Sequence, residues 1–256
     1  MIDNVTVTTW THSTYNDVWP LYYGQYEEMA PFFKHAVFIN KQSDGLPDYC
    51  KQVINTETDP FYKRLVECLN EIEDEITLFS LEDFILYDSV DETVMENLTE
   101  YLKKSEYDFI RLIRSGINEA HTGPSKLING ELNLYEIPFD CQYLYCLQAS
   151  LWKKQSLINH FNSYKPRDFY ESEIKGSNSA RALKNLKGLF VWNNDNLCKG
   201  DFVADHSDSS VFPFMSSALH GASYGKPSKW LTSLYRNKLS PLFEKYGIDP
   251  TIRGEC

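Results

Sequence analysis

The first half of the chain alternates between two patterns of apolar residues. Short runs rich in β-branched and aromatic residues predict strands, and these runs are Val5–Trp10, His35–Ile39, Glu75–Leu81 and Phe109–Ile113. Between them, apolar residues recur every three or four positions, which predicts amphipathic helices. Because helices separate successive strands, we expect parallel pairing and a sheet with helices on both faces.

The predicted helices in this half begin at recognisable start signals. Asp17-Val18-Trp19-Pro20 is typical of a first turn, and Asp59-Pro60 combines an acidic cap with proline at the first helical position. Asp91 supplies the cap of a third helix. The apolar residues predicted to face inward on the last two helices are Phe61, Leu65, Leu69, Ile72, Val94, Met95, Leu98 and Leu102.

The second half of the chain has a less regular pattern. Its predicted strands are Gln142–Ser150 and Gly188–Trp192, and its predicted helices are Leu151–Phe161, Asp168–Leu186 and Ser228–Tyr246. No repeat, low-complexity segment or linker rich in Gly, Ser and Pro interrupts the sequence. We therefore expect one α/β domain over residues 1–256.

Composition narrows the class of protein. Hydrophobic residues make up 42% of the 256 residues, which is enough for a large core. No apolar run is long enough to cross a bilayer, and the N-terminal residues lack the pattern of a secretory signal, so we expect a cytoplasmic protein without a transmembrane segment. The six cysteines lack zinc-site spacing and are expected to be reduced thiols.

The net charge of −11 argues against a nucleic acid partner, because binding a phosphate backbone requires a basic surface. It leaves open a phosphorylated small molecule, which a few basic groups or a bound cation can hold. Two adjacent carboxylates, Glu82 and Asp83, follow the apolar strand that ends at Leu81. Ligands of open α/β sheets bind at this edge, and carboxylate oxygens suit Mg²⁺ or Mn²⁺. The alternative is a solvated turn before the next helix.

Several segments, in order, resemble one family of enzymes. They are Asn16–Pro20, Phe61–Leu69, Glu75–Asp91, Leu147–Trp152 and Tyr170–Ser177. Together they resemble GT-A-fold glycosyltransferases, especially small bacterial and viral sugar transferases of surface-glycan synthesis. Each segment is only moderately specific, and their order and spacing carry the resemblance.

The resemblance implies a GT-A, Rossmann-like fold with a mainly parallel sheet. It also implies a nucleotide-sugar-binding half at residues 1–115 and an acceptor-binding, catalytic half at 116–256. The donor would be a nucleoside-diphosphate sugar, the acceptor a glycan or glycoconjugate, and the cofactor Mn²⁺ or Mg²⁺. The usual metal motif is Asp-x-Asp, whereas Leu81 takes its first position here, which leaves metal dependence open. Asp83 keeps the expected ligand position, with Glu82 beside it.

An inverting transferase needs a base that takes the proton from the attacking acceptor hydroxyl. The resemblance assigns this role to Glu173, with Glu171 as its neighbour. Without the resemblance, these acids and Asp168 would be read as charges near a helix start.

Other candidate contacts are weaker. The resemblance suggests that Arg64 contacts the donor nucleotide or its phosphate, although an ion pair with Glu67 or Glu71 is the plain alternative. In the late glycine-containing segment, His220 could complete a metal site and Lys226 could neutralise the diphosphate, unless the segment is simply a turn.

The loop after the first strand commonly holds the nucleotide base in this fold, and here it offers Thr9, Thr11 and His12. Two other functions remain open at this stage. A sugar nucleotidyltransferase would need a glycine-rich, basic loop after the first strand, whereas Thr9 to Asn16 contains no glycine, lysine or arginine. A glycan-binding or assembly protein that keeps the fold without turnover is the third possibility.

Overall fold

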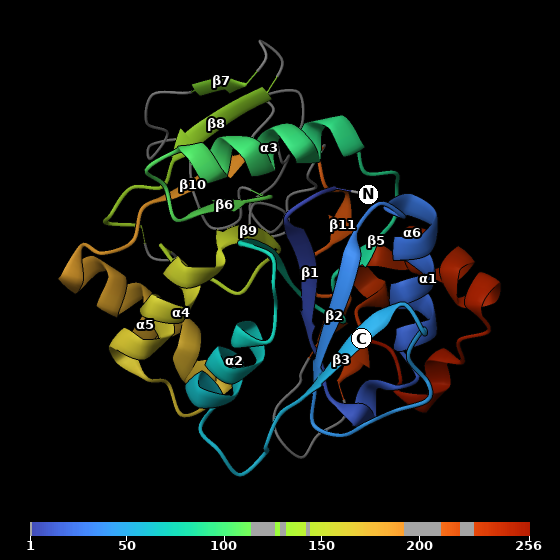
Figure 1. Ribbon diagram of the computed structural model, residues 1–256. Helices are drawn as coiled ribbons and strands as arrows, with labels where there is room; N and C mark the ends of the chain where they lie inside the picture. The colour runs from blue at the N-terminus through green and yellow to red at the C-terminus, as the bar shows by residue number, and fades with distance from the viewer. Residues whose placement is uncertain (1, 114–125, 129–131, 142–143, 192–210, 221–227) are drawn as a thin grey trace.

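One mixed β-sheet forms the centre of the computed structural model, which describes residues 2–113, 126–128, 132–141, 144–191, 211–220 and 228–256 (Figure 1). Its nine strands lie in the order β3 (Cys50–Ile54), β2 (Lys34–Ile39), β1 (Val5–Trp10), β4 (Ile76–Leu81), β9 (Ser150–Lys153), β6 (Phe109–Arg111), β10 (Gly188–Val191), β8 (Leu132–Glu136) and β7 (Lys126–Ile128). Two short pairs complete the described strands: β5 (Ile85–Leu86) with β11 (Phe214–Met215), and β12 (Leu219–His220) with β13 (Lys229–Trp230).

Most strands of the sheet run parallel. β3, β2, β1 and β4 pair in parallel, as do β6 and β10. β9 is inserted antiparallel between β4 and β6, so those two strands point in the same direction. Because β9 comes from the second half of the chain, a single sheet joins both halves, as expected for one domain.

Helices cover both faces of the sheet, as the sequence predicts. They are α1 (Trp19–Met29), α2 (Phe61–Asn70), α3 (Glu92–Lys104), α4 (Lys154–Tyr164), α5 (Phe169–Leu183) and α6 (Thr232–Tyr246), with 3-10 turns at Ser13–Tyr15 and Pro250–Ile252. Successive residues of a strand point to opposite faces. Leu78 of β4 accordingly lies in the core under α1, α3 and α6, and Phe79 lies in the core under α2, α4 and α5.

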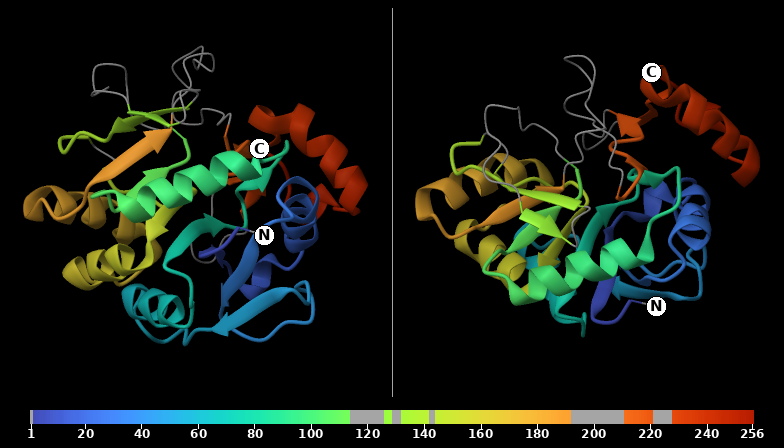
Figure 2. Two further views of the ribbon diagram at one scale, coloured as in Figure 1. Left: turned by 45° about the horizontal axis from the view of Figure 1, so that its top comes forward. Right: turned by 90° about the horizontal axis from the view of Figure 1, so that it is seen from above.

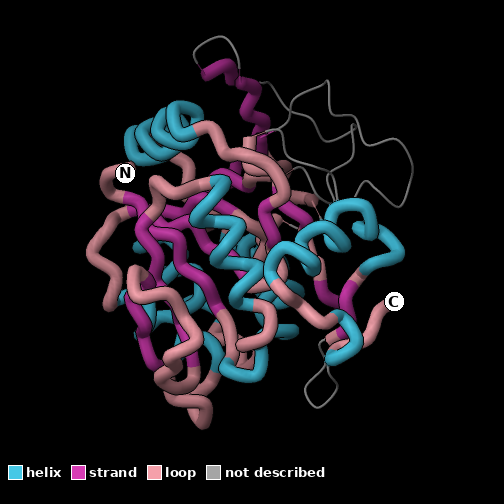
Figure 3. Tube along the Cα trace, turned by 90° about the vertical axis from the view of Figure 1, so that its right-hand side faces the viewer, coloured by secondary structure: helices cyan, strands magenta, loops and turns pink. Residues whose placement is uncertain are grey.

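The C-terminal part of the chain packs against α1. Figures 2 and 3 show α6 beside α1, at the edge of the molecule away from α4 and α5. The Tyr246 hydroxyl donates to Oε1 of Gln25 at 2.8 Å, and a side chain at Gly24 would overlap the Tyr246 ring. After α6 the chain turns back, and the N–H of Trp230 donates to the carbonyl of Gly254 at 3.0 Å. Among the described residues, no helix is long and apolar enough to span a bilayer.

Several predicted elements are confirmed within a few residues. The strands at β1, β2, β4, β6 and β10 and the helices at α1, α2, α3 and α5 all occur. Asp91 caps α3 by accepting a 3.1 Å hydrogen bond from the N–H of Val94. At α2, however, Pro60 is itself the cap residue, and the Asp59 carboxylate lies 2.9 Å from Nζ of Lys63. The prediction that Asp59 caps this helix is therefore wrong.

Three boundaries in the second half, and one strand in the first, differ from the prediction. The strand expected over 142–150 is in fact β9, which begins only at Ser150, and the helix expected from Leu151 begins at Lys154. The terminal helix expected from Ser228 begins at Thr232, because Lys229 and Trp230 pair as β13. β3 was not anticipated. It is a short edge strand in which only Cys50 and Val53 are buried, so its burial does not follow the two-residue alternation of a strand.

Candidate functional site

Polar residues follow four neighbouring strands at one edge of the sheet. They are Thr11 and His12 after β1, Asn40 after β2, Asn55 after β3, and Glu82 and Asp83 after β4. These strands are parallel and adjacent, so their carboxyl ends meet at the same edge, where ligands of open α/β sheets bind. The expectation that Glu82 and Asp83 lie at the carboxyl edge is confirmed.

The two carboxylates of this edge lie in a poorly solvated environment. Glu82 is 9% exposed and Asp83 is partly buried. Burial, together with the adjacent charge of Asp83, raises the pKa of Glu82 to about 8. Burial also raises the pKa of Asp83 to about 7. Carboxylate oxygens are the ligands that Mn²⁺ and Mg²⁺ prefer. A divalent cation bound between the two side chains would favour their charged forms.

Thr11 is buried and its hydroxyl does not face outward. The hydroxyl accepts a 3.0 Å hydrogen bond from Nε1 of Trp19. Thr9 lies deeper, fully buried, with its hydroxyl 3.0 Å from that of Tyr22. Thr9 points beneath α1, so in this structure it cannot contact a donor, contrary to the expectation.

His12 lies at the rim of the same edge. Its Nε2 is 2.7 Å from Oε1 of Glu57, and its Nδ1 is 2.8 Å from the hydroxyl of Thr14. The loop is tied to β2 by the N–H of Ser13, which donates to Oδ1 of Asn40 at 2.9 Å. His12 therefore holds the loop in shape and is partly exposed at this edge.

Arg64 points from α2 toward the ends of β1 and β3. Its Nε donates to Oδ1 of Asn55 at 2.8 Å, and its guanidinium lies 5.0 Å from the centre of the Trp10 ring. The ion pair with Glu67 belongs to Lys63 instead, at 3.7 Å. A guanidinium that is fixed on one side by an aromatic ring and an amide suits contact with a phosphate or a planar base.

Glu173 reaches this edge from the second half of the chain. The N–H of Leu147 donates to Oε1 of Glu173 at 2.8 Å, and Leu147 lies three residues before β9. Because β9 is antiparallel to β4, with Ser150 opposite Phe79, its start lies beside the end of β4. The fold thus brings Glu173 to the strand next to Glu82 and Asp83.

The neighbouring acids of α5 have structural contacts. Asp168 caps the helix by accepting from the N–H of Glu171 at 2.8 Å. Hydrogen bonds from Arg167 and Lys175 lower the pKa of Glu171 to about 2. Asp168 and Glu171 are therefore charged residues that stabilise the start of the helix. The Glu173 carboxylate instead accepts a hydrogen bond from the N–H of Leu147, outside the helix.

The late loop does not complete a metal site with the described residues. His220 is exposed in β12 and pairs with Lys229 of β13. Within the described part of the chain, no three His, Cys, Asp or Glu side chains lie together as a metal-binding group, so the expected set of Glu82, Asp83 and His220 is not formed. Lys226 lies outside the described residues.

Arg253, which the sequence did not point to, is a well-connected cation near this edge. It donates to both carboxylate oxygens of Asp17, at 2.6 and 2.7 Å, and to the hydroxyl of Ser228 at 2.8 Å. It also donates to the Thr14 carbonyl at 3.0 Å and lies 4.5 Å from the centre of the Tyr15 ring. The loop after β1 is thereby tied to the C-terminal segment.

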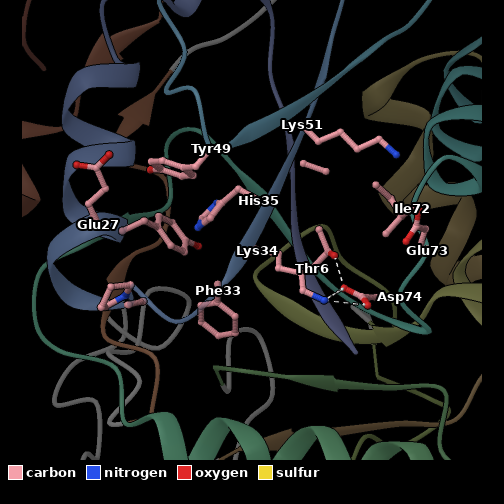
Figure 4. Close-up of a pocket in the computed structure, with 14 residues that line it drawn as sticks. Thr6, Glu27, Phe33, Lys34, His35, Tyr49, Lys51, Ile72, Glu73 and Asp74 are labelled. Carbon is pink, nitrogen blue, oxygen red and sulfur yellow. Dashed lines mark hydrogen bonds and ion pairs between the residues drawn. The ribbon is translucent and has the colours of Figure 1, made fainter. Parts of the chain in front are cut away.

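A cavity of about 670 Å³ lies at the opposite, amino edge of the sheet (Figure 4). It is lined by residues at the starts of β1, β2 and β3, and one side is formed by Tyr49, His35 and Phe33. Asp74 accepts there from Thr6 at 2.6 Å and is paired with Lys34. Burial lowers the pKa of His35 to about 3, so this ring is neutral. None of the candidate residues lines this cavity, and we assign the site to the carboxyl edge because Glu82 and Asp83, whose pKa values burial raises, lie there.

Comparison with known proteins identifies the fold. The mannosyltransferase PcManGT from Pyrobaculum calidifontis, solved in complex with GDP-Man and Mn²⁺, superposes with a TM-score of 0.50 at 13% identity over 96% of this chain and 64% of that chain. The chain has the GT-A fold. This chain aligns with 64% of that transferase, so it spans less than two thirds of the transferase's length.

Two other solved structures are more distant. TarS from S. aureus aligns over 75% of this chain and 58% of its own, with 12% identity and a TM-score of 0.45. The bifunctional IspDF from Campylobacter jejuni aligns over 85% of this chain and 56% of its own, with 15% identity and a TM-score of 0.43. No protein-family model and no curated protein sequence matches the chain.

Proposed function

We propose that this chain transfers a sugar from a nucleoside-diphosphate donor to an acceptor hydroxyl, with inversion at the sugar. One relationship carries the proposal: Glu82 and Asp83 follow β4, and the Glu173 carboxylate of α5 accepts a hydrogen bond from the segment that leads into the adjacent strand β9, in a GT-A fold. Binding of a charged donor and removal of a proton would thus take place side by side.

The donor's diphosphate would be held by a divalent cation at Asp83 and Glu82, which follow β4 at the carboxyl edge of the sheet. When bound, the cation would neutralise charge that develops on the leaving diphosphate. Arg64, fixed against Trp10 and Asn55, and His12, at the rim, would contact the nucleotide. Lys226 would add a second positive charge to the diphosphate.

Glu173 would act as general base on the acceptor. One of its oxygens accepts a hydrogen bond from the Leu147 N–H, which holds the carboxylate in place. Inversion needs a single base on the face of the sugar opposite the leaving group. The acceptor would be a glycan or glycoconjugate, bound by the half of the chain from residue 116 onward.

The test is a thermal-shift screen of nucleoside-diphosphate sugars with and without Mn²⁺, followed by donor hydrolysis in the stabilising condition. A donor that binds only the folded chain raises its melting temperature. We expect stabilisation by at least one donor, greater with Mn²⁺, and slow release of the nucleoside diphosphate. No stabilisation by any donor would overturn the proposal. Stabilisation without any hydrolysis or transfer would instead support a glycan-binding or assembly protein.

A further inference from the structure

The cavity at the amino edge of the sheet has the size of a small-molecule site (Figure 4). Its volume of about 670 Å³ falls within the range of roughly 300–1,000 Å³ that is usual for ligand pockets. Glu82 and Asp83 follow the other end of the strands, and β1 and β4 each contain 6 residues, so the two edges are about 20 Å apart. The cavity is therefore separate from the proposed transfer site.

One wall of the cavity consists of aromatic rings. Tyr49 is 46% exposed although its ring is large and apolar. The imidazole of His35 packs edge-on against it, with the ring centres 5.5 Å apart, and Tyr26 packs edge-on against His35 at 4.9 Å. A partly exposed ring that other rings hold in place offers a flat apolar surface to an occupant of the cavity.

The imidazole of His35 also carries a polar atom that the fold leaves unsatisfied. His35 is 6% exposed, and its Nδ1 has no hydrogen-bond partner among the described residues. Most buried polar atoms in folded proteins are paired, because burying one without a partner is costly. The ring is neutral, so Nδ1 either donates or accepts one hydrogen bond, according to the tautomer. A hydroxyl group can both donate and accept, which makes it a partner for either tautomer.

The remaining polar lining carries charges of both signs. The charged lining residues are Glu27, Lys34, Lys51, Glu73 and Asp74. Asp74 pairs with Lys34 at 3.4 Å, and the ammonium group of Lys51 donates to the carbonyl of Glu71. Positive charge is not in excess, which disfavours a phosphorylated or carboxylated ligand. An ammonium group could only donate, whereas uncharged hydroxyl groups can use both the acids and the lysines.

We propose that this cavity is a second binding site, and that its ligand is an uncharged sugar. The sugar ring packs on the exposed ring of Tyr49, and its hydroxyl groups form hydrogen bonds with Nδ1 of His35 and with the charged side chains of the lining. The inference does not depend on the proposed function, because the cavity contains none of the residues proposed for transfer.

Nuclear magnetic resonance titrations of the full chain with uncharged disaccharides test the assignment, without nucleotide or metal. The probes are maltose, cellobiose, lactose, mannobiose and diacetylchitobiose. We expect at least one of them to shift the imidazole signals of His35 and the ring signals of Tyr49, and to leave the signals of Glu82 and Asp83 in place. The amino-sugar and uronic-acid analogues of the sugar that binds are charged, and they should bind more weakly.

Variants of Tyr49 test the aromatic contact. Tyr49→Ala removes the ring and should weaken binding of the probe by about tenfold, whereas Tyr49→Phe keeps the ring and should bind within about threefold of the parent. Phe139→Ala is the matched control, because Phe139 is 43% exposed and does not line the cavity. This control should leave the affinity unchanged.

Three results would overturn the inference: no shift at His35 and Tyr49 with any uncharged probe, tighter binding of a charged analogue, or equal affinity of the parent and Tyr49→Ala. A probe that shifts Glu82 and Asp83 but not His35 would place sugar binding at the carboxyl edge, which overturns this inference and leaves the proposed function intact. A chain that binds an uncharged probe at His35 but no nucleoside-diphosphate sugar would support this site and overturn the proposed function.

Discussion

The backbone N–H of Leu147 donates a 2.8 Å hydrogen bond to Oε1 of Glu173, and this contact joins α5 to the segment that leads into β9. Ser177, one turn further along α5, forms a second link, since its hydroxyl donates to the Tyr145 carbonyl at 2.7 Å and accepts from the Tyr145 N–H at 3.2 Å. The carboxylate is therefore held by the fold at the start of the strand beside β4.

Glu173→Gln tests the proposed base. Glutamine keeps the size of the side chain and an oxygen that can accept from Leu147, but it has no basicity. We expect nearly unchanged donor affinity and a transfer rate lower by about two to four orders of magnitude. The measurement is kcat and KM for transfer, with donor binding measured separately.

Glu171→Gln is the control for this prediction, because its carboxylate is already engaged by Arg167 and Lys175. Glu171→Gln should lower the transfer rate much less than Glu173→Gln does. If both variants transfer at the parental rate, the base lies elsewhere or the reaction retains configuration, and the stereochemistry of the product distinguishes these two cases.

Asp83→Asn tests the acidic pair. The amide is isosteric but is a poor ligand for a hard cation, so Mn²⁺-dependent binding of the donor should be lost while the fold remains intact. Calorimetry with and without Mn²⁺ measures the effect, and circular dichroism checks the fold. A variant that binds donor as tightly as the parent, with the same Mn²⁺ dependence, would remove the cation role.

The raised pKa values of Glu82 and Asp83 predict a pH dependence with a defined sign. In the unfolded chain these groups titrate near pH 4, whereas in the fold they titrate at about 8 and about 7. Folding therefore favours the protonated forms, and the contribution of these groups to stability is full below about pH 4 and is lost as pH rises toward 8.

A cation competes with these protons, so the rise in melting temperature produced by Mn²⁺ should be larger at about pH 8.5 than at about pH 6. Thermal melts at a fixed Mn²⁺ concentration across this range measure it. Asp83→Asn should flatten the dependence. A Mn²⁺ effect that is constant or larger at the lower pH would contradict the assignment of the cation to this pair.

The sequence predicts elements whose signals are local. The strand at β4 and the capped helix α3 depend on neighbouring residues, and the structure confirms both. Residues 142–150 were predicted as a strand, and 144–149 are described residues of that segment that lie outside β9. They are buried by α5 instead, and the hydrogen bonds of Tyr145 and Leu147 go to its side chains. Apolar composition alone does not distinguish a buried strand of the sheet from an irregular segment that a helix buries.

The candidate site residues that the sequence could predict were likewise those with a local signal. Glu82 and Asp83 could be proposed because they directly follow a strand. Arg253 gave no local signal, since its contact with Asp17 spans 236 positions. Thr9 was wrongly included because a strand pattern does not show which face of β1 lies beneath α1.

Gly176→Ala tests whether the docking of α5 depends on close approach to the segment before β9. A methyl group at this position would lie 2.6 Å from the Tyr145 ring, which is fully buried against Trp152, His160 and Phe161 and has no room to move. Alanine normally stabilises a helix by about 1 kcal/mol relative to glycine. Here we expect a loss of about 1–3 kcal/mol instead, because the clash moves α5 away.

Urea denaturation measures this change in the free energy of unfolding, and Gly45→Ala is the control. A methyl group at Gly45 would meet its nearest atoms at 3.6 Å, so stability should stay within about 0.5 kcal/mol of the parent. Because Glu173 lies one turn before Gly176 on the same face of α5, the displaced helix should also carry the carboxylate away from Leu147 and lower the transfer rate. A Gly176→Ala chain with raised stability and full transfer would show that close packing at Tyr145 does not position Glu173.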